Sequence, residues 1–352
     1  MAGLAGADRR VWPAMTRWIR RFAIGAVVVV TGLIGVLAVG LGALRLAAHL
    51  RETESAAAAA PADGKFVDSG HGRLFVMDPA PPGGIPVVLF HGTAAWSKLW
   101  WRTTAALKAD GYRPIVPDLP PFGYSERQGG YTRAEQAARI DGMMTALGAG
   151  RAVIVGHSFG AGAALEYVLR HPDRAIGLVL VDAALGLTQP PSDPPALLAY
   201  RPLRELAVAA TATDPLATRF LLSKLIYRKD AASGETLDIL KAPMRVTGTT
   251  SHIADWLLYF TGSDRAALSA SRDEVSKIKV PVAMIWGDRD DVTPLAQAND
   301  LRALIPQASL KVMQDVGHIP QIEDPAAFNA ALIDAIRQLA SADPAVAHAG
   351  RN

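Results

Sequence analysis

Hydrophobic residues near the N-terminus form one long, uninterrupted stretch. From Phe22 to Leu44 no charged side chain occurs, which is about the length that a helix needs to cross the apolar core of a bilayer. The pattern predicts a transmembrane helix over 22–44. A cleavable signal peptide is the alternative, because an alanine tract follows at 56–60. Its apolar stretch, however, usually spans only about 7 to 15 residues, so we favour a retained single-pass anchor.

The charges on either side of this stretch predict its orientation. Two arginines follow it and are offset by Glu52 and Glu54, whereas five arginines precede it: Arg9, Arg10, Arg17, Arg20 and Arg21. Because lysine and arginine are retained on the cytoplasmic side, we expect residues 1–21 to be cytoplasmic and the rest to lie on the outer or periplasmic side. The alanine-rich residues 45–64 are expected to form a tether without fixed structure.

Beyond residue 65, short aliphatic runs alternate with longer stretches of helical period. We expect strands at 66–67, 74–77, 87–90, 114–116, 152–155, 177–181, 280–286 and 309–312. Helices are expected at 100–110, 133–147, 159–170, 294–305 and 325–341. Such alternation is typical of an α/β fold, in which helices flank a mostly parallel sheet, here of eight strands with a hairpin at its start.

One stretch interrupts this alternation. Residues 183–276 have helical composition, several prolines near their start and no convincing strand. Ordinary connecting helices are the alternative, but connections in compact domains are usually about 4 to 6 residues long. We therefore predict a helical cap at 183–276 that divides the core into 65–182 and 277–342, followed by a disordered tail at 343–352.

Charge and composition exclude several classes of protein. The net charge of the 352 residues is +3, but residues 1–51 carry +6, so the remainder carries −3. This mildly acidic part offers no basic surface for nucleic acid. The chain has no cysteine, which excludes disulfides, thiolate metal sites and a cysteine nucleophile. No metal-binding motif such as H-E-x-x-H occurs, so we expect neither a metal nor another cofactor.

A candidate nucleophile stands in the segment Gly156-His157-Ser158-Phe159-Gly160. It follows one predicted strand and begins an apolar helix. A sharp strand-to-helix turn forces its central residue into a strained backbone conformation, which presents the Ser158 hydroxyl above the sheet edge. A lone G-x-S-x-G is common, but this context makes it specific.

A serine hydroxyl needs a base, usually a histidine that a carboxylate orients. Of eight histidines, His318 lies in the loop between the last predicted strand and the last helix. The loop after the preceding strand offers three aspartates, of which Asp290 stands at the tip of the turn. Asp182, at the end of an earlier strand, is the alternative. Loops at the carboxyl ends of parallel strands meet at one edge, so these side chains are expected to lie together.

Two further features complete the predicted site. Acyl transfer develops an oxyanion, which backbone N–H groups stabilise, and we expect those of Phe159 and Thr93 to do so. Apolar substrate contacts are expected from aromatic residues, chiefly Trp96, Phe122 and Trp256. Further candidates for the same role are Trp100, Trp101, Phe159, Tyr259 and Phe260.

These segments together resemble the α/β-hydrolase superfamily, and specifically its cap-bearing serine hydrolases. The resemblance covers about 66–340 and rests on LFHGT, PDLPPFGYSE, VGHSFG, GDRDDVTP and DVGHIP, with Pro121 where the family usually has glycine. It is similar to bacterial esterases, cofactor-free haloperoxidases and carbon–carbon bond hydrolases. The resemblance implies the α/β-hydrolase fold and a serine hydrolase that cleaves an apolar carboxylic ester. Carbon–carbon hydrolysis, perhydrolysis and a noncatalytic binding role remain the alternatives.

Overall fold

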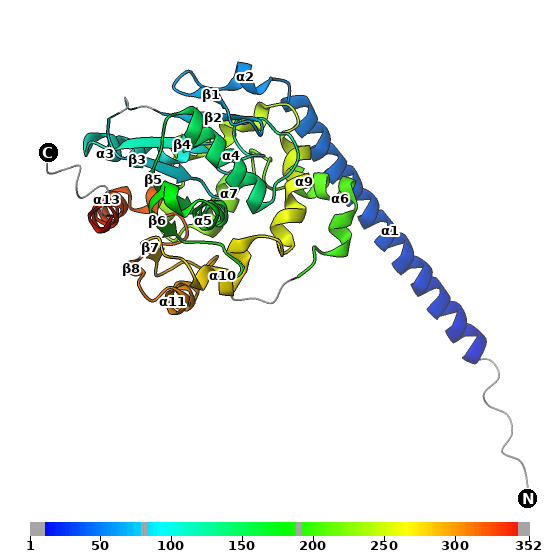
Figure 1. Cartoon of the computed structure of the whole chain (residues 1–352). Coiled ribbons are helices and arrows are strands. Elements are labelled where there is room, and N and C mark those ends of the chain that lie inside the picture. Colours follow the sequence, from blue (N-terminus) through cyan, green and yellow to red (C-terminus); the bar gives the residue numbers. More distant parts are fainter. Residues whose placement is uncertain (1–10, 79, 81–82, 188–191, 344–352) are drawn as a thin grey trace, which may run out of the picture.

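The computed structural model describes residues 11–78, 80, 83–187 and 192–343, and it contains one eight-stranded sheet (Figure 1). Its spatial order is β1-β2-β4-β3-β5-β6-β7-β8. The first two pairings, β1 with β2 and β2 with β4, are antiparallel, and the others are parallel. The strands are β1 Lys65–Asp68, β2 Arg73–Met77, β3 Pro86–Phe90, β4 Arg113–Pro117, β5 Ala152–His157, β6 Ala175–Val181, β7 Val282–Gly287 and β8 Ser309–Met313. The predicted fold class is confirmed.

Helices cover both faces of the sheet and bury a separate apolar core on each. The flanking helices are α3 Trp101–Ala109, α4 Arg133–Ala146, α5 Phe159–Arg170, α11 Leu295–Leu304, α12 Pro320–Glu323 and α13 Pro325–Ala342. Alternation along β5 shows how the strands serve both cores. Val153 and Val155 pack in the core that includes α3 and α13, whereas Ile154 packs in the core with α4, α5 and α11.

A helical segment lies between β6 and β7, and we call it the cap. It contains α6 Arg201–Ala209, α7 Thr218–Leu225, α8 Gly234–Lys241, α9 Thr249–Thr261 and α10 Arg272–Ser276. Within the described residues of the cap the only β-type pairing is an isolated bridge from Glu54 to Val246. The helices α6 and α9 pack against each other, and α6 also packs against the N-terminal helix.

The N-terminal helix α1 runs without a break from Val11 to Arg51 and extends well away from the domain (Figure 1). Its apolar part, which is long and hydrophobic enough to cross a membrane, is exposed. From Leu41 onward one face is partly or fully buried, at positions 41, 44, 45 and 48. This spacing of three to four residues is that of one helix face, so the last three turns of α1 pack on the cap.

Residues 45–64 differ from the expected unstructured tether. Arg45 donates to Glu205 (3.1 Å) and Arg51 to the Met244 carbonyl (3.3 Å). The buried Glu52 carboxylate accepts from the Thr250 amide (3.0 Å). A short helix, α2 Ala56–Ala59, follows. The alanine-rich composition suggested a flexible linker, but polar partners on the cap order it. The expected tail at 343–352 lies outside the described residues except for Asp343, which pairs with Arg151.

Candidate active site

The turn between β5 and α5 places the Ser158 side chain at the carboxyl edge of the sheet. Ser158 has φ +50° and ψ −119°, a conformation that residues with a side chain rarely adopt. The glycines on either side are required by close packing. A Cβ at Gly156 would lie 2.5 Å from Cα of Ala161, and one at Gly160 would lie 2.5 Å from the His91 carbonyl oxygen. The strained turn predicted from the sequence is present.

Ser158, His318 and Asp290 form a continuous chain of hydrogen bonds. His318 Nε2 lies 2.8 Å from Ser158 Oγ, and His318 Nδ1 lies 2.8 Å from Asp290 Oδ2. All three residues are buried, with exposed fractions of 6% or less. The two ring nitrogens of the histidine therefore face a hydroxyl on one side and a carboxylate on the other, as general-base activation of the serine requires.

Several donors hold the Asp290 carboxylate in place. Its Oδ1 accepts from the amides of Val292 (2.8 Å) and Thr293 (2.9 Å), and its Oδ2 also accepts from the Thr293 hydroxyl (2.6 Å). Burial by itself raises the pKa of Asp290. The hydrogen bonds from His318 and Thr293 outweigh burial, so the net pKa lies below the usual aspartate value. Asp290 is thus an anion that supports positive charge on His318.

Asp182, the alternative acid, is also buried at this site. The side-chain acceptor atoms of Asp182 and Asp290 and a ring nitrogen of His318 all lie within 4.8 Å of one another. The histidine nonetheless bonds to Asp290, while Asp182 Oδ1 accepts from the Gly287 amide (2.9 Å). Burial, and then the negative charge of Asp290, raise the pKa of Asp182 well above its usual value. Two carboxyls share this pocket, and Asp182 is the one whose pKa is raised.

The two amides predicted to bind an oxyanion lie beside the serine. Phe159 is the first residue of α5, and Thr93 lines the same cavity as Ser158. Neither N–H donates a hydrogen bond to another group in the part of the chain that the structure describes, so both are available to a ligand. Gly92 allows the Thr93 loop to approach, because a Cβ there would lie 3.2 Å from Ser158 Cβ.

Comparison with known proteins agrees with this architecture. Residues 85–325 match the model of the family described as alpha/beta hydrolase fold. The chain belongs to the α/β-hydrolase family. It is a serine hydrolase of that fold, with relatives that include esterases, lipases and carbon–carbon bond hydrolases.

Individual relatives of this α/β hydrolase differ in the bond they cleave. It is 28% identical over 276 residues to the 2-hydroxy-6-oxo-6-phenylhexa-2,4-dienoate hydrolase of Burkholderia cepacia, which covers 76% of this chain and 88% of that protein. Lipase 3 of Moraxella sp. (strain TA144) is 26% identical over 247 residues, and the match covers 68% of this chain and 73% of the lipase. A solved membrane phospholipase A shares the fold, with 22% identity, a TM-score of 0.62 and coverage of 91% and 99%.

The loop that carries His318 is held by a residue that sequence reasoning missed. The buried carboxylate of Glu323 accepts from the amides of Gly317 (2.9 Å) and Ile319 (3.1 Å), on either side of the histidine. It also accepts from the amides of Tyr227 (2.7 Å) and Arg228 (2.9 Å) in the cap. One carboxylate therefore joins the histidine loop of the hydrolase to the cap. The motif Val316–Pro320 ends before Glu323, so no local signal pointed to it.

An apolar cavity of about 240 Å³ opens at Ser158 and His318. The cap supplies half of the residues that line it, and α7 presents four of them at helical spacing: Thr218, Leu221, Leu222 and Leu225. Other large side chains in the lining are Leu99, Leu240, Met244, Phe260 and Val292. None of the lining residues is an aspartate, glutamate, lysine or arginine. The spacing along α7 is visible in the sequence, but it does not reveal which face meets the serine.

Most of the aromatic residues expected to contact substrate lie elsewhere. Phe122 and Trp256 are buried in an aromatic cluster with Phe159, with ring centroids 4.9 to 5.8 Å apart. Trp96 donates its indole N–H to the Ile239 carbonyl (2.6 Å) and is buried between core and cap. None of the three principal candidates lines the Ser158 cavity. Large aromatic surfaces join cap and core here, whereas leucines supply five of the residues that line the cavity.

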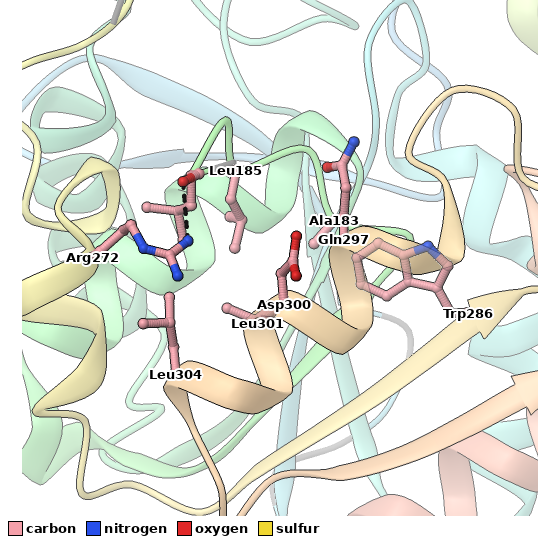
Figure 2. A pocket seen from close by; sticks show the side chains of 9 residues that line it. Ala183, Leu185, Arg272, Trp286, Gln297, Asp300, Leu301 and Leu304 are labelled. Atoms are coloured by element: carbon pink, nitrogen blue, oxygen red, sulfur yellow. Dashed lines mark hydrogen bonds between the residues drawn. The ribbon is translucent and has the colours of Figure 1, made fainter. Parts of the chain in front are cut away.

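A second cleft lies between α11 and the loop that follows β6. Figure 2 shows Arg272, Trp286 and Asp300 among the side chains around it. Its volume is only about 10 Å³, which is room for about one water molecule. It is too small for a substrate, and its lining includes none of the residues of the Ser158 site.

Proposed function

We propose that this α/β hydrolase cleaves a carboxylic ester of an apolar acid through an acyl-enzyme. The observation that carries the proposal is the buried hydrogen-bond chain from Ser158 to His318 to Asp290. In the first step Ser158 Oγ attacks the ester carbonyl carbon while His318 Nε2 takes its proton. The amides of Phe159 and Thr93 stabilise the resulting oxyanion, and Asp290 stabilises the imidazolium.

Collapse of this intermediate breaks the bond to the alcohol, which leaves with the proton from His318. Water then attacks the acyl-enzyme by the same route, and the acid is released. The hydrogen-bonded chain from Ser158 to Asp290 speaks against a noncatalytic role on this fold.

The chemistry of the cavity favours an ester over a carbon–carbon substrate. The dienoate named for the Burkholderia relative carries a carboxylate, and a buried anion requires a cationic or hydrogen-bonding partner. The cavity at Ser158 is lined mainly by aliphatic side chains and by no lysine or arginine. Three threonines also line it, and the hydroxyls of Thr211 and Thr218 donate to backbone carbonyls of the chain itself. A neutral acyl chain suits this lining, and the name of the Moraxella lipase agrees with that chemistry. Perhydrolysis would use the same groups and is separated from ester hydrolysis only by assay.

The test is covalent labelling of the full chain in detergent by a fluorophosphonate probe, followed by hydrolysis of p-nitrophenyl esters of increasing chain length. We expect labelling and turnover that Ser158→Ala abolishes. A vinylogous diketone acid and a peracid assay serve as the comparison substrates. A folded protein that neither reacts with the probe nor hydrolyses any ester would overturn the proposal, and faster cleavage of the diketone would transfer it to carbon–carbon hydrolysis.

We further propose that α1 is a retained anchor with the hydrolase on the outer or periplasmic side. The support is structural as well as compositional, because Arg45, Arg51 and Glu52 tie the end of the helix to the cap. Cleavage after the alanine tract at 56–60 would remove these contacts. Protease treatment of spheroplasts tests the orientation. The hydrolase domain should be digested, and full protection of the domain in intact spheroplasts would contradict it.

A further inference from the structure

Large apolar side chains are exposed on the cap and hardly anywhere else on the domain. Among the described residues beyond α1, all the strongly exposed large hydrophobic side chains except Val292 belong to the cap. They are Leu197, Tyr200, Leu216, Phe220, Tyr227, Tyr259 and Phe260, with exposed fractions from 42% to 89%. Contiguous exposed apolar surface on a soluble domain usually marks a surface that something else covers.

Four of these residues form what we call the cap edge: Leu197, Tyr200, Tyr259 and Phe260. Ion pairs hold the segments of the cap edge together. Arg201, directly after Tyr200, pairs with Glu205 in its own helix and with Asp255 in α9 (3.0 Å). Tyr259 follows Asp255 by one helical turn. The cap edge therefore comprises the start of α6 with the turn before it, and the end of α9.

The position of α1 relates the cap edge to the apolar span. Glu205 also binds Arg45 of α1 (3.1 Å), so α6 and α1 are joined at the residue that follows the uncharged stretch. In Figure 1, α6 runs alongside α1, and the start of α6 points toward the exposed half of that helix. Residues 18–40 of α1 are exposed, and burial against the cap begins at Leu41. The cap edge thus lies near the position along α1 at which the helix stops packing on the domain.

The cavity of the active site opens at the same place. Phe260 lines the cavity and is 50% exposed, so its ring lies at the cavity mouth. At Phe260 the cap edge therefore meets the apolar lining of the cavity. A water-soluble substrate has no need of an apolar approach to the serine, whereas an acyl chain leaving a bilayer does.

We propose that the cap edge rests on the outer leaflet of the bilayer that α1 crosses, and that the substrate is a lipid ester that enters the cavity from that leaflet. This inference rests on the proposed ester hydrolysis and on the proposed anchor. Tyrosine is suited to this position, because its ring prefers the boundary between headgroups and acyl chains. The occupant is a bilayer because α1, docked on the cap, brings a membrane to the cap edge.

The absence of cysteine from the chain makes the contact directly measurable. The full-length Leu197→Cys variant is labelled with an environment-sensitive fluorophore and reconstituted in phosphatidylcholine vesicles that contain a shallow nitroxide-labelled lipid. Lys108→Cys, at an exposed position of α3 on the side of the domain away from α1 (Figure 1), is the matched control. We expect at least threefold stronger quenching at position 197 than at 108. Equal quenching at the two positions overturns the inference. A blue shift of the fluorophore at position 197 that occurs without lipid and grows with protein concentration also overturns it, because it indicates a contact between two copies of the protein.

A kinetic experiment separates this inference from the proposed function. The Leu197→Ser, Tyr200→Ser double variant is compared with wild type on p-nitrophenyl butyrate in solution and on a phospholipid ester in vesicles. We expect unchanged butyrate hydrolysis and about tenfold slower vesicle hydrolysis. The matched control is Leu216→Ser, an exposed leucine of the cap outside the cap edge. Residue 216 lies near Thr213, whose carbonyl accepts from Arg51 at the C-terminal end of α1.

The outcomes of the kinetic experiment differ for the two claims. If Leu216→Ser and the double variant lose vesicle hydrolysis equally, or if neither loses it, the membrane contact is overturned. The proposed ester hydrolysis still stands in that case, provided that butyrate hydrolysis depends on Ser158. Wild type that hydrolyses butyrate but no vesicle lipid has the same meaning. Absence of all Ser158-dependent hydrolysis overturns the proposed function itself.

Discussion

Replacement of Glu323 by alanine tests how His318 is positioned. The carboxylate accepts four backbone N–H groups, two beside His318 and two in the cap. Its Oε2 accepts three of these bonds and Oε1 accepts one. Removing it leaves donors without a partner in two loops at once. The change acts without touching Ser158, His318 or Asp290.

The magnitude follows from the buried hydrogen bonds. A buried N–H without a partner costs about 1 to 3 kcal/mol, and loss of one partner of a buried charged group costs about 3 to 5 kcal/mol. Water that enters the space left by the side chain satisfies some of the four donors. We therefore expect the free energy of unfolding to fall by about 4 kcal/mol, which lowers the Tm by roughly 10 °C. A shift of His318 by about 1 Å costs on the order of 100-fold in rate. The loss should appear in kcat more than in KM, because the change acts on the position of His318, whereas the Glu323 side chain itself does not line the cavity.

The assay compares three full-length variants in detergent by thermal unfolding and by hydrolysis of p-nitrophenyl butyrate. Glu323→Gln keeps an oxygen for the three-donor position and should retain activity to within about tenfold of wild type. Asp324→Ala, the neighbouring helix cap of α13, should cost about 1 kcal/mol with little change in kcat. If Glu323→Ala loses stability but keeps its kcat, the carboxylate holds the fold and not the histidine, and the reasoning is wrong.

Three further predictions test other parts of the structure. Gly123→Ala should lower the free energy of unfolding in urea by several kcal/mol more than Gly148→Ala. Both positions have φ near +60°, so the backbone strain is the same. A Cβ at Gly123 would lie 2.0 Å from Asp118 Oδ2, whereas one at Gly148 meets nothing within 4 Å. Asp182→Asn should become more stable relative to wild type as the pH rises from 4 to 8. Because the pKa of Asp182 is raised in the folded state, its contribution to stability is complete below the unfolded pKa of about 3.9 and is lost as the pH rises toward the folded pKa. Asparagine does not titrate, so the variant loses nothing over this range. A stability difference between variant and wild type that is independent of pH would contradict this. Leu222→Ala enlarges the cavity and should raise the ratio of kcat/KM for a dodecanoate over a butyrate ester by about tenfold; an unchanged ratio would place the acyl chain elsewhere.

The parts of the fold and site that sequence predicts well are those set by local patterns. Strands and helices follow from apolar periodicity, and the parallel order brings loop ends to one edge. Ser158, Asp290 and His318 were therefore expected to meet before any contact was known, and the structure joins them at 2.8 Å. The choice between Asp290 and Asp182 needed more than order, because both follow strands that are neighbours in the sheet.

What sequence did not predict depends on contacts between residues far apart in the chain. Arg45 and Glu205 are separated by 160 positions, and composition alone made residues 45–64 look like a loose linker. The same reason explains the aromatic residues: Trp256 and Leu222 are both apolar, but only the packing of cap on core decides that one joins the two parts and the other lines the cavity. The cap supplies half of the residues that line the cavity, and the end of α1 packs on the cap. We therefore expect a change in the docked turns of α1 to alter substrate preference, because it changes how the cap is held over Ser158.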